Sequence, residues 1–220
     1  MKFIFLLLFT SIGFAQNSFV VHYNFTLNEK LYELFPEFNN LENQMETLDI
    51  QLHIEGYKSV FFNGNATKEN NMAAIFARVN NPLYYDLKTK VFLYNNPERF
   101  YLKENEYLIK DDNQENWEIT SEQKQINEFT ALKAINKTKK NTIAWFVPEL
   151  NYPFGPGKFN NLPGLIVELQ NEQGYYTMSK IMFSNDTSVV LPEKGSHITA
   201  EEFSKLQAEI EKEAKRIYNN

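Results

Sequence analysis

Hydrophobic and polar side chains alternate one by one through much of this chain. Between residues 48 and 55, four aliphatic side chains alternate with four polar ones. Successive side chains of a strand point to opposite faces, so this period is typical of a strand with one buried face. Comparable runs follow, with polar turns between them. They predict strands at residues 19–27, 48–55, 59–62, 72–79, 84–94, 99–109, 117–119, 129–134, 142–147, 165–169 and 175–183.

Helical periodicity is clearest at the end of the chain, over residues 199–218. Thr199 and Glu202 form a capping-box pair, in which each side chain can bond the backbone amide of the other residue. Apolar residues then recur at spacings of three and four, namely Phe203, Leu206, Ile210, Ala214 and Ile217. This narrow stripe predicts a helix that docks on the body of the protein, and a partner-binding helix is the alternative. Residues 31–45 also have helical spacing, but Pro36 interrupts it, so we expect a short helix or a packed loop there.

These elements predict a mainly β protein with a C-terminal helix (α+β), formed by one domain over residues 16–220. We expect a large, strongly curved antiparallel sheet, for which a half-open barrel resembling lipoprotein-carrier folds is one form. Aromatic residues make up 15% of the chain, enough to line a concave apolar face as well as a core. Residues 165–167 are three consecutive apolar residues, which is typical of a strand covered on both faces. We expect the C-terminal helix to cover this strand.

The first fifteen residues have the pattern of a secretory signal peptide. Lys2 precedes a short apolar run, and Gly13-Phe14-Ala15 then supplies a small-x-small cleavage site. The run is too short to span a bilayer comfortably, and a buried N-terminal strand or helix is the alternative. No second long apolar run follows. We therefore expect cleavage near Ala15 and an exported protein, periplasmic or extracellular, that is soluble and has no transmembrane span.

The amino-acid composition and the net charge limit the kinds of partner that this chain can bind. The chain has no cysteine, so a disulfide and a lipid-attached cysteine are both excluded. Its formal net charge is −6, and it has no basic cluster. An acidic chain of this kind is a poor candidate for binding nucleic acid or anionic lipid. An envelope protein or an apolar ligand remains as a partner.

Candidate catalytic and metal-binding residues are few. His22 and His53 fall on the polar faces of two predicted strands, and Asp49 and Glu55 share the face of His53. Two neighbouring strands of this kind could hold a cation. Ordinary solvent-facing histidines are the expected reading, because no His-x-His or His-Glu-x-x-His spacing occurs. The chain also lacks a Gly-x-Ser-x-Gly motif, a phosphate loop and a dinucleotide fingerprint. We expect no enzymatic activity, no catalytic residues, no metal and no cofactor.

Glycine and proline gather in one segment. Four of the eight prolines lie between Pro148 and Pro163, and four of the eight glycines between Gly155 and Gly174. Such a composition predicts a path set by turns. Residues 162–165 fit a type II turn, in which Gly164 supplies the positive φ. We call residues 155–165 the signature loop. Its candidate site residues are Gly155, Pro156, Gly157, Phe159, Leu162, Pro163, Gly164 and Leu165.

The signature loop carries a family resemblance. Residues 161–166, Asn-Leu-Pro-Gly-Leu-Ile, resemble the name-giving motif of the GLPGLI family, exported proteins of Bacteroidetes-type bacteria, with Asn161 in place of the leading glycine. Asn tolerates positive φ better than other non-glycine residues, so this exchange is mild. Residues 144–150 and 154–159 resemble the preceding blocks of the family. A weaker block follows Trp117, where Ala131 stands at a position that often holds cysteine in the family. The resemblance implies an exported β-rich protein with no established activity and carries over no catalytic residue.

Two classes of function follow. We expect a non-enzymatic envelope protein that binds or carries an apolar ligand or an extended peptide on its aromatic-rich concave sheet. The alternative is a structural or interaction protein of an outer-membrane assembly, which would use the signature loop for recognition. A hydrolase is a distant third. Within the loop itself, we favour a structural role, in which Phe154, Phe159 and Leu162 pin the loop onto the sheet.

Overall fold

The computed structural model describes residues 18–34, 48–65, 74–75, 77, 79, 81–98, 102–184 and 188–218. The predicted signal peptide lies outside the described residues, and so do residues 35–45 of the segment with helical spacing. Within the described part of that segment, residues 29–34 are helical.

Twelve strands make up about half of the described chain. They are β1 (Ser18–Leu27), β2 (Ile50–Glu55), β3 (Lys58–Asn63), β4 (Leu83–Asp86), β5 (Val91–Asn95), β6 (Tyr107–Asp111), β7 (Trp117–Ile126), β8 (Phe129–Asn136), β9 (Ile143–Val147), β10 (Leu165–Gln170), β11 (Gly174–Ser184) and β12 (Ser196–Thr199). Two helices have defined bounds, α1 (Glu29–Leu34) and α4 (Ala200–Tyr218). The predicted class, mainly β with a C-terminal helix, is confirmed.

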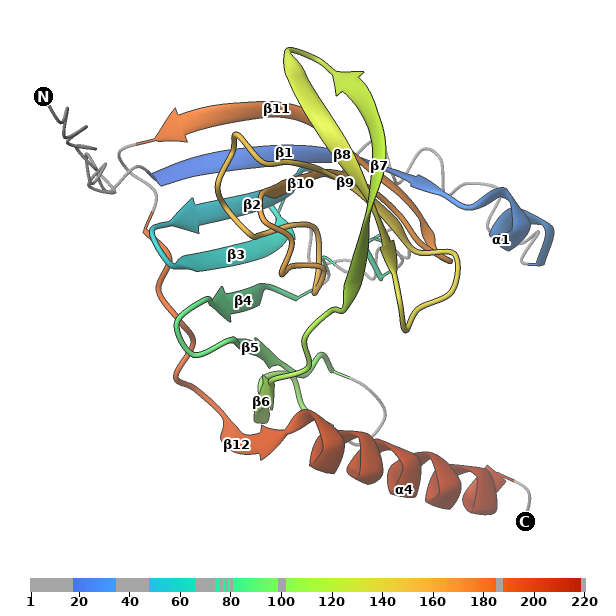
Figure 1. Ribbon diagram of the computed structural model, residues 1–220. Helices are drawn as coiled ribbons and strands as arrows, with labels where there is room; N and C mark the ends of the chain where they lie inside the picture. Colours follow the sequence, from blue (N-terminus) through green and yellow to red (C-terminus); the bar gives the residue numbers. More distant parts are fainter. Residues whose placement is uncertain are drawn as a thin grey trace, which may run out of the picture.

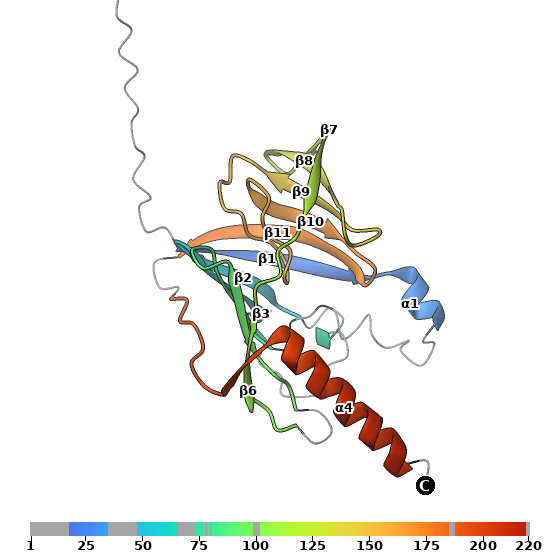
Figure 2. The same ribbon diagram turned by 60° about the horizontal axis from the view of Figure 1, so that its bottom comes forward.

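All twelve strands belong to one sheet, in the order β12-β6-β5-β4-β3-β2-β1-β11-β10-β9-β8-β7 (Figure 1). Neighbouring strands are antiparallel except for β12, which is parallel to β6. The sheet is strongly bent, and Figure 2 shows the β7–β10 part rising away from the β2–β6 part. It stays open and does not close into a barrel.

Several predicted strands differ from the observed ones. The run predicted at 84–94 is two strands, because the Asp86 carboxylate accepts the backbone N–H groups of Lys88 and Thr89 and turns the chain between β4 and β5. Of the run predicted at 72–79, residues 72, 73, 76 and 78 lie outside the described residues, and Ala74 and Ile75 are helical, in keeping with the helix propensity of alanine.

The polar strands were the hardest to predict. β7 extends to Ile126, well beyond the predicted residues 117–119. It is largely exposed on both faces, so its sequence lacks the alternation that marks a half-buried strand. β12 was not predicted because it is short and forms only by pairing with β6. Residues 99–101 of the run predicted at 99–109 lie outside the described residues; of the rest, Leu102 forms an isolated bridge and β6 begins at Tyr107.

The C-terminal helix docks at one end of the sheet. Glu202 N–H donates to Thr199 Oγ1 (3.2 Å), and Thr199 N–H donates to Glu202 Oε2 (2.9 Å), which confirms the capping box. Phe203 packs on Leu102 and Ile109 beside β6 and β12. The helix therefore does not cover residues 165–167, and that prediction is wrong. No helix in the described part of the chain is both long and apolar enough to cross a membrane.

The connection between β9 and β10, residues 148–164, covers β10 instead. Leu165 N–H donates to Leu150 O and Ile166 N–H donates to Phe154 O, both at 2.9 Å. Residues 165–167 are fully buried. The connection lies in the angle of the bent sheet (Figure 2), on the face that also buries Phe19 and Phe146. We call this the inner face and the opposite one the outer face.

Candidate functional site

The β9–β10 connection fills the inner face with aromatic side chains. Tyr152 meets Phe19 of β1 edge-on, with ring centroids 4.4 Å apart. Phe154 meets Tyr85 of β4 at 6.0 Å. Two more rings, Phe159 and Trp117, lie 6.3 Å apart at the β7 side. The connection therefore contacts both parts of the bent sheet, and its rings belong to the main hydrophobic core.

Polar contacts anchor the same connection. The Lys158 ammonium bonds the Asp111 carboxylate of β6 at 2.5 Å and lies 4.2 Å above the ring of Tyr94. Burial by itself would raise the pKa of Asp111, but the Lys158 ammonium and the donors of Asn113 outweigh it, and the pKa of this carboxyl is lowered. At the other side, Trp117 Nε1–H donates to the backbone oxygen of Asn160 at 2.8 Å.

The turn at the end of the signature loop differs from the predicted one. Gly164 has a positive φ, as predicted, but its value of 158° is far from that of a type II turn. Gly164 N–H donates to Leu162 O (2.8 Å), so a three-residue turn surrounds Pro163. A Cβ atom on Gly164 would overlap the carbonyl oxygen of Val147 and lie 2.7 Å from its carbon. Glycine is thus needed chiefly for close approach of two backbones. Asn161 has φ of 70°, the conformation expected for a residue that replaces glycine.

Most signature-loop residues are buried. Gly155, Pro156, Gly157, Phe159, Leu162, Gly164 and Leu165 are buried, and Pro163 alone of the eight candidates is exposed. Asn161 beside it is exposed too, while Lys158 is half-buried. The structure thus brings the candidates together inside the protein. A partner would reach little more than Asn161 and Pro163, which favours the structural role for this loop.

The two histidine strands are neighbours, because β1 pairs with β2. On their outer face, His22 Nδ1 lies 3.0 Å from Asp49 Oδ1. Gln51 bonds the other Asp49 oxygen and lies 2.6 Å from His53 Nε2. Glu55 points elsewhere and accepts the backbone N–H of Val189. These side chains form a chain of hydrogen bonds.

This cluster does not make a metal site. Among the described residues, no group of three or more His, Asp or Glu side chains is placed to hold a metal ion. The pKa of His53 is lowered, first by burial and then by the neighbouring His22, while Asp49 acts in the opposite direction. The third histidine, His197, is exposed on β12 and lies away from this cluster.

An exposed apolar row lies on the outer face of β8 to β11, and sequence reasoning missed it. Tyr175 pairs with Gln170, Gln170 with Ile143, and Ile143 with Ile135 across four strands. Tyr175 is 43% and Ile135 41% exposed. Trp145 stands one position further along β9 on the same face. We call Ile135, Ile143, Trp145 and Tyr175 the outer strip. Period-2 alternation against the buried Ala144 and Phe146 was the available signal.

Paired charges border the outer strip. The Lys124 ammonium lies 4.4 Å above the ring of Trp145 and is paired with the Glu168 carboxylate. Lys133 pairs with Glu122 at 2.9 Å. Neither of the described helices covers this part of the sheet (Figure 1). The strip is therefore a partly exposed apolar surface that Gln170 interrupts and paired charges border.

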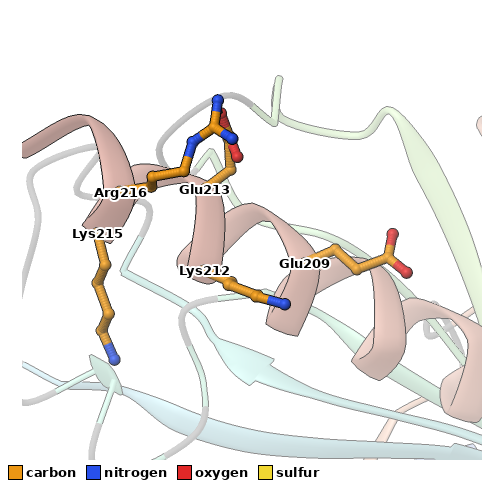
Figure 3. A pocket seen from close by; sticks show the side chains of 5 residues that line it. All are labelled: Glu209, Lys212, Glu213, Lys215 and Arg216. Atoms are coloured by element: carbon orange, nitrogen blue, oxygen red, sulfur yellow. The ribbon is translucent and has the colours of Figure 1, made fainter.

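A hollow of about 440 Å³ lies beside the C-terminal half of α4. Its lining is charged and consists of Glu209, Lys212, Glu213, Lys215 and Arg216. Figure 3 shows these side chains pointing in different directions from one helix, with Arg216 beside Glu213. No apolar residue lines this hollow, whose walls are the hydrocarbon stems of charged side chains, so it does not suit an apolar ligand.

Comparison with known proteins adds the fold alone. No protein-family model and no curated protein matches the chain. The resemblance to the GLPGLI family stays a prediction. Solved structures of PNGF-II in the C2 and P21 space groups are similar, with TM-scores of 0.56 and identities of 11% and 13%. The matches cover 86% and 87% of this chain, but only 32% and 33% of those chains. This chain thus spans about a third of the length of the structures that it matches.

Proposed function

We propose that this chain is an exported, non-enzymatic envelope protein that binds a protein partner through the outer strip. The observation that carries this proposal is the filling of the inner face by the β9–β10 connection. A filled inner face leaves no space for a carried ligand, so we favour the binding of a protein partner over the carrier role. In this proposal the signature loop has a structural role. It packs on the inner face and stabilises the bent sheet whose outer face carries the outer strip.

A carrier would need a hollow for its ligand, and ligand pockets usually measure at least about 300 Å³. On the inner face, the rings that would line such a hollow already contact one another. Phe19, Phe146 and Phe154 are almost completely buried by the protein itself. An apolar ligand there would have to displace the connection and break the Lys158–Asp111 pair.

The outer strip has the character of an interaction surface. In an antiparallel sheet with one solvated face, polar residues normally occupy that face. Here, Ile135, Ile143, Trp145 and Tyr175 stand on that face over β8 to β11, with Gln170 within the row and paired charges beside it. An apolar centre with a polar rim is the usual composition of a protein–protein contact, in which aromatic residues contribute most of the affinity.

Export forms part of the proposal and rests on the signal-peptide pattern of residues 1–15. N-terminal sequencing of the protein from its own host should begin at Gln16. Recovery of the intact chain from the inner membrane would contradict export.

Native mass spectrometry of protein purified from its host tests the binding role. We expect a stoichiometric protein partner with the wild type and its loss in the double variant Ile135→Ser, Tyr175→Ser. Phe183→Ser is the matched control, because Phe183 is 78% exposed but lies outside the outer strip. It should keep the partner. A co-purifying lipid or peptide would support the carrier role instead, and retention of the partner by the double variant would exclude the outer strip.

A further inference from the structure

The two edges of the sheet are protected to different degrees. One edge is β12, which has four residues and continues directly into α4. The other edge is β7, which has ten residues and contains neither proline nor glycine. Among the described strands, β7 pairs with β8 alone, so the second side of its backbone lacks a strand partner. Natural proteins usually shorten, cover or interrupt such an edge, because its N–H and C=O groups can pair with a further strand.

Most residues of β7 are exposed, and Ile119 is 48% exposed although it is apolar. The pairing of β7 with β8 is irregular between Ile119 and Gln123, where the Thr120 hydroxyl accepts the backbone N–H of Glu122. On either side of this irregularity, residues 117–119 and 123–126 pair with β8 in regular register. The edge therefore offers two regular segments with a short irregular one between them.

This arrangement matches itself when a second β7 strand runs antiparallel and both strands are centred on Ser121. Residues 117–119 of one copy then face residues 123–125 of the other, and the irregular segment faces its own counterpart. Two identical strands related in this way form an isologous contact, the kind that closes a symmetric dimer.

The charges of β7 favour the same register. Glu118, Thr120, Glu122 and Lys124 stand on the outer face, because side chains alternate along a strand. With Ser121 at the centre, Glu118 of each copy faces Lys124 of the other, and Thr120 faces Glu122. A centre one residue earlier would oppose Glu118 to Glu122, and a centre one residue later would oppose Glu122 to itself. Like charges directly opposite each other destabilise a strand pair, so both neighbouring registers are disfavoured.

Both members of the predicted pair are available for it. Glu118 is exposed and has no ion-pair partner among the described residues. Lys124 is already paired with Glu168, but its side chain is 36% exposed and an ammonium group has three donors. A second carboxylate can therefore join the existing pair.

We propose that two copies of this chain pair through β7 and form a dimer with one continuous antiparallel sheet. The two-fold axis passes beside Ser121, and Glu118 of each copy bonds Lys124 of the other. Both outer strips then lie on the same face of the joined sheet. The contact uses the edge of β7, which is the outermost strand of the β7–β10 part (Figure 2), so it is independent of partner binding at the outer strip.

Sedimentation velocity of the purified wild type should show a dimer that dissociates on dilution. Lys124→Glu and Glu118→Lys each oppose like charges at both ends of the contact, so each should raise the dissociation constant by about tenfold or more. A wild type that is monomeric at about 0.1 mM, or a dimer that both variants leave unchanged, would overturn the proposal.

Mixing the two variants tests the pairing directly. Glu118→Lys has lysine at both positions and Lys124→Glu has glutamate at both, so one chain of each should form a heterodimer about as tight as the wild-type dimer. Recovery on mixing would show that neither substitution merely damages its own chain. If the variants dissociate the dimer but do not recover together, Glu118 does not face Lys124 and the proposal is wrong.

Glu122→Lys is the matched control, because it makes the same charge change on the same strand face. It faces Thr120 in the proposed register and should keep the dimer. Dissociation by Glu122→Lys but not by Glu118→Lys would instead centre the contact on Gln123 and contradict the proposed pairing. The double variant of the outer strip should remain dimeric, so this proposal and the proposed partner binding can fail separately.

Discussion

At the scale of single residues, the signature loop depends on the absence of a side chain at Gly164. Its φ is positive, and the backbone of Val147 and Pro148 lies where a Cβ atom would be. Gly157 makes a contrast in the same loop, because it also has positive φ (60°) but open space around its missing Cβ. Conformational strain and steric overlap can therefore be separated with two alanine substitutions.

Gly164→Ala should destabilise the protein by about 3 kcal/mol, the upper end of the range for overpacked positions. Gly157→Ala should lose only about 1 kcal/mol, from placing alanine in the left-handed region. Urea unfolding of both variants and the wild type measures the difference. Equal losses would mean that the backbone approach at Val147 does not matter.

His53 should make stability depend on pH. Its pKa in the folded protein lies below the ordinary value of 6.5. As pH falls through 6.5, the unfolded chain takes up a proton before the folded one does, so stability is complete above this pH and declines below it. Tm should therefore fall between pH 7.5 and 5.5, and less steeply in His53→Gln. His197→Gln is the control for the loss of an imidazole, because His197 is exposed. If Tm of His53→Gln depends on pH as steeply as that of the wild type, His53 is not the source of the pH dependence.

At the scale of elements, the β9–β10 connection and α4 each hold a different part of the sheet. The connection contacts β6 through the Lys158–Asp111 ion pair. The side chain of Asp111 is 6% exposed and that of Lys158 is 28% exposed. The helix reaches β6 through a small separate cluster around Phe203. These two contacts allow local tests of the architecture.

Lys158→Met should destabilise the protein by about 2–3 kcal/mol. Removing one partner of a fully buried ion pair costs about 3–5 kcal/mol. The loss expected here is smaller because Lys158 is partly exposed. Asp111→Asn in the same chain should recover part of the loss, since no unpaired carboxylate remains. Because the folded pKa of Asp111 is lowered, the wild-type advantage should be present at neutral pH and disappear as pH falls through that value. Chemical unfolding at pH 7 and pH 3 would show this, and equal differences at both pH values would contradict it.

Phe203→Ala should loosen α4 and its end of the sheet, at a loss of about 3 kcal/mol for a large buried side chain. Hydrogen exchange should rise in β6 and β12 and stay unchanged in β9 and β10. Increased exchange at residues 165–167 would instead indicate that the helix stabilises β10 after all.

At the scale of the whole molecule, the β9–β10 connection joins the two parts of the bent sheet. Its rings contact β1, β4 and β7, and its lysine contacts β6. The parts should therefore unfold together rather than as separate units.

The two tryptophans of the chain provide the test, because Trp117 and Trp145 both lie in the β7–β9 part. Thermal transitions followed by tryptophan fluorescence and by far-ultraviolet circular dichroism should coincide in the wild type and shift together in Gly164→Ala. Separate transitions would show that the connection does not couple the two parts.

What could be read from the sequence was local. Alternation identified β2, which has one buried face, and β1, which alternates in its second half. The Thr199–Glu202 pair identified the start of α4, because capping involves residues three apart. The Gly/Pro cluster identified the signature loop and the positive φ of Gly164. Contacts between residues that lie far apart in the sequence are determined by the tertiary structure alone. α4 docks on β6 rather than β10, Lys158 meets Asp111, and the outer strip forms only when four strands align. No local period encodes these contacts, since they arise from the bend of the sheet that brings distant segments together.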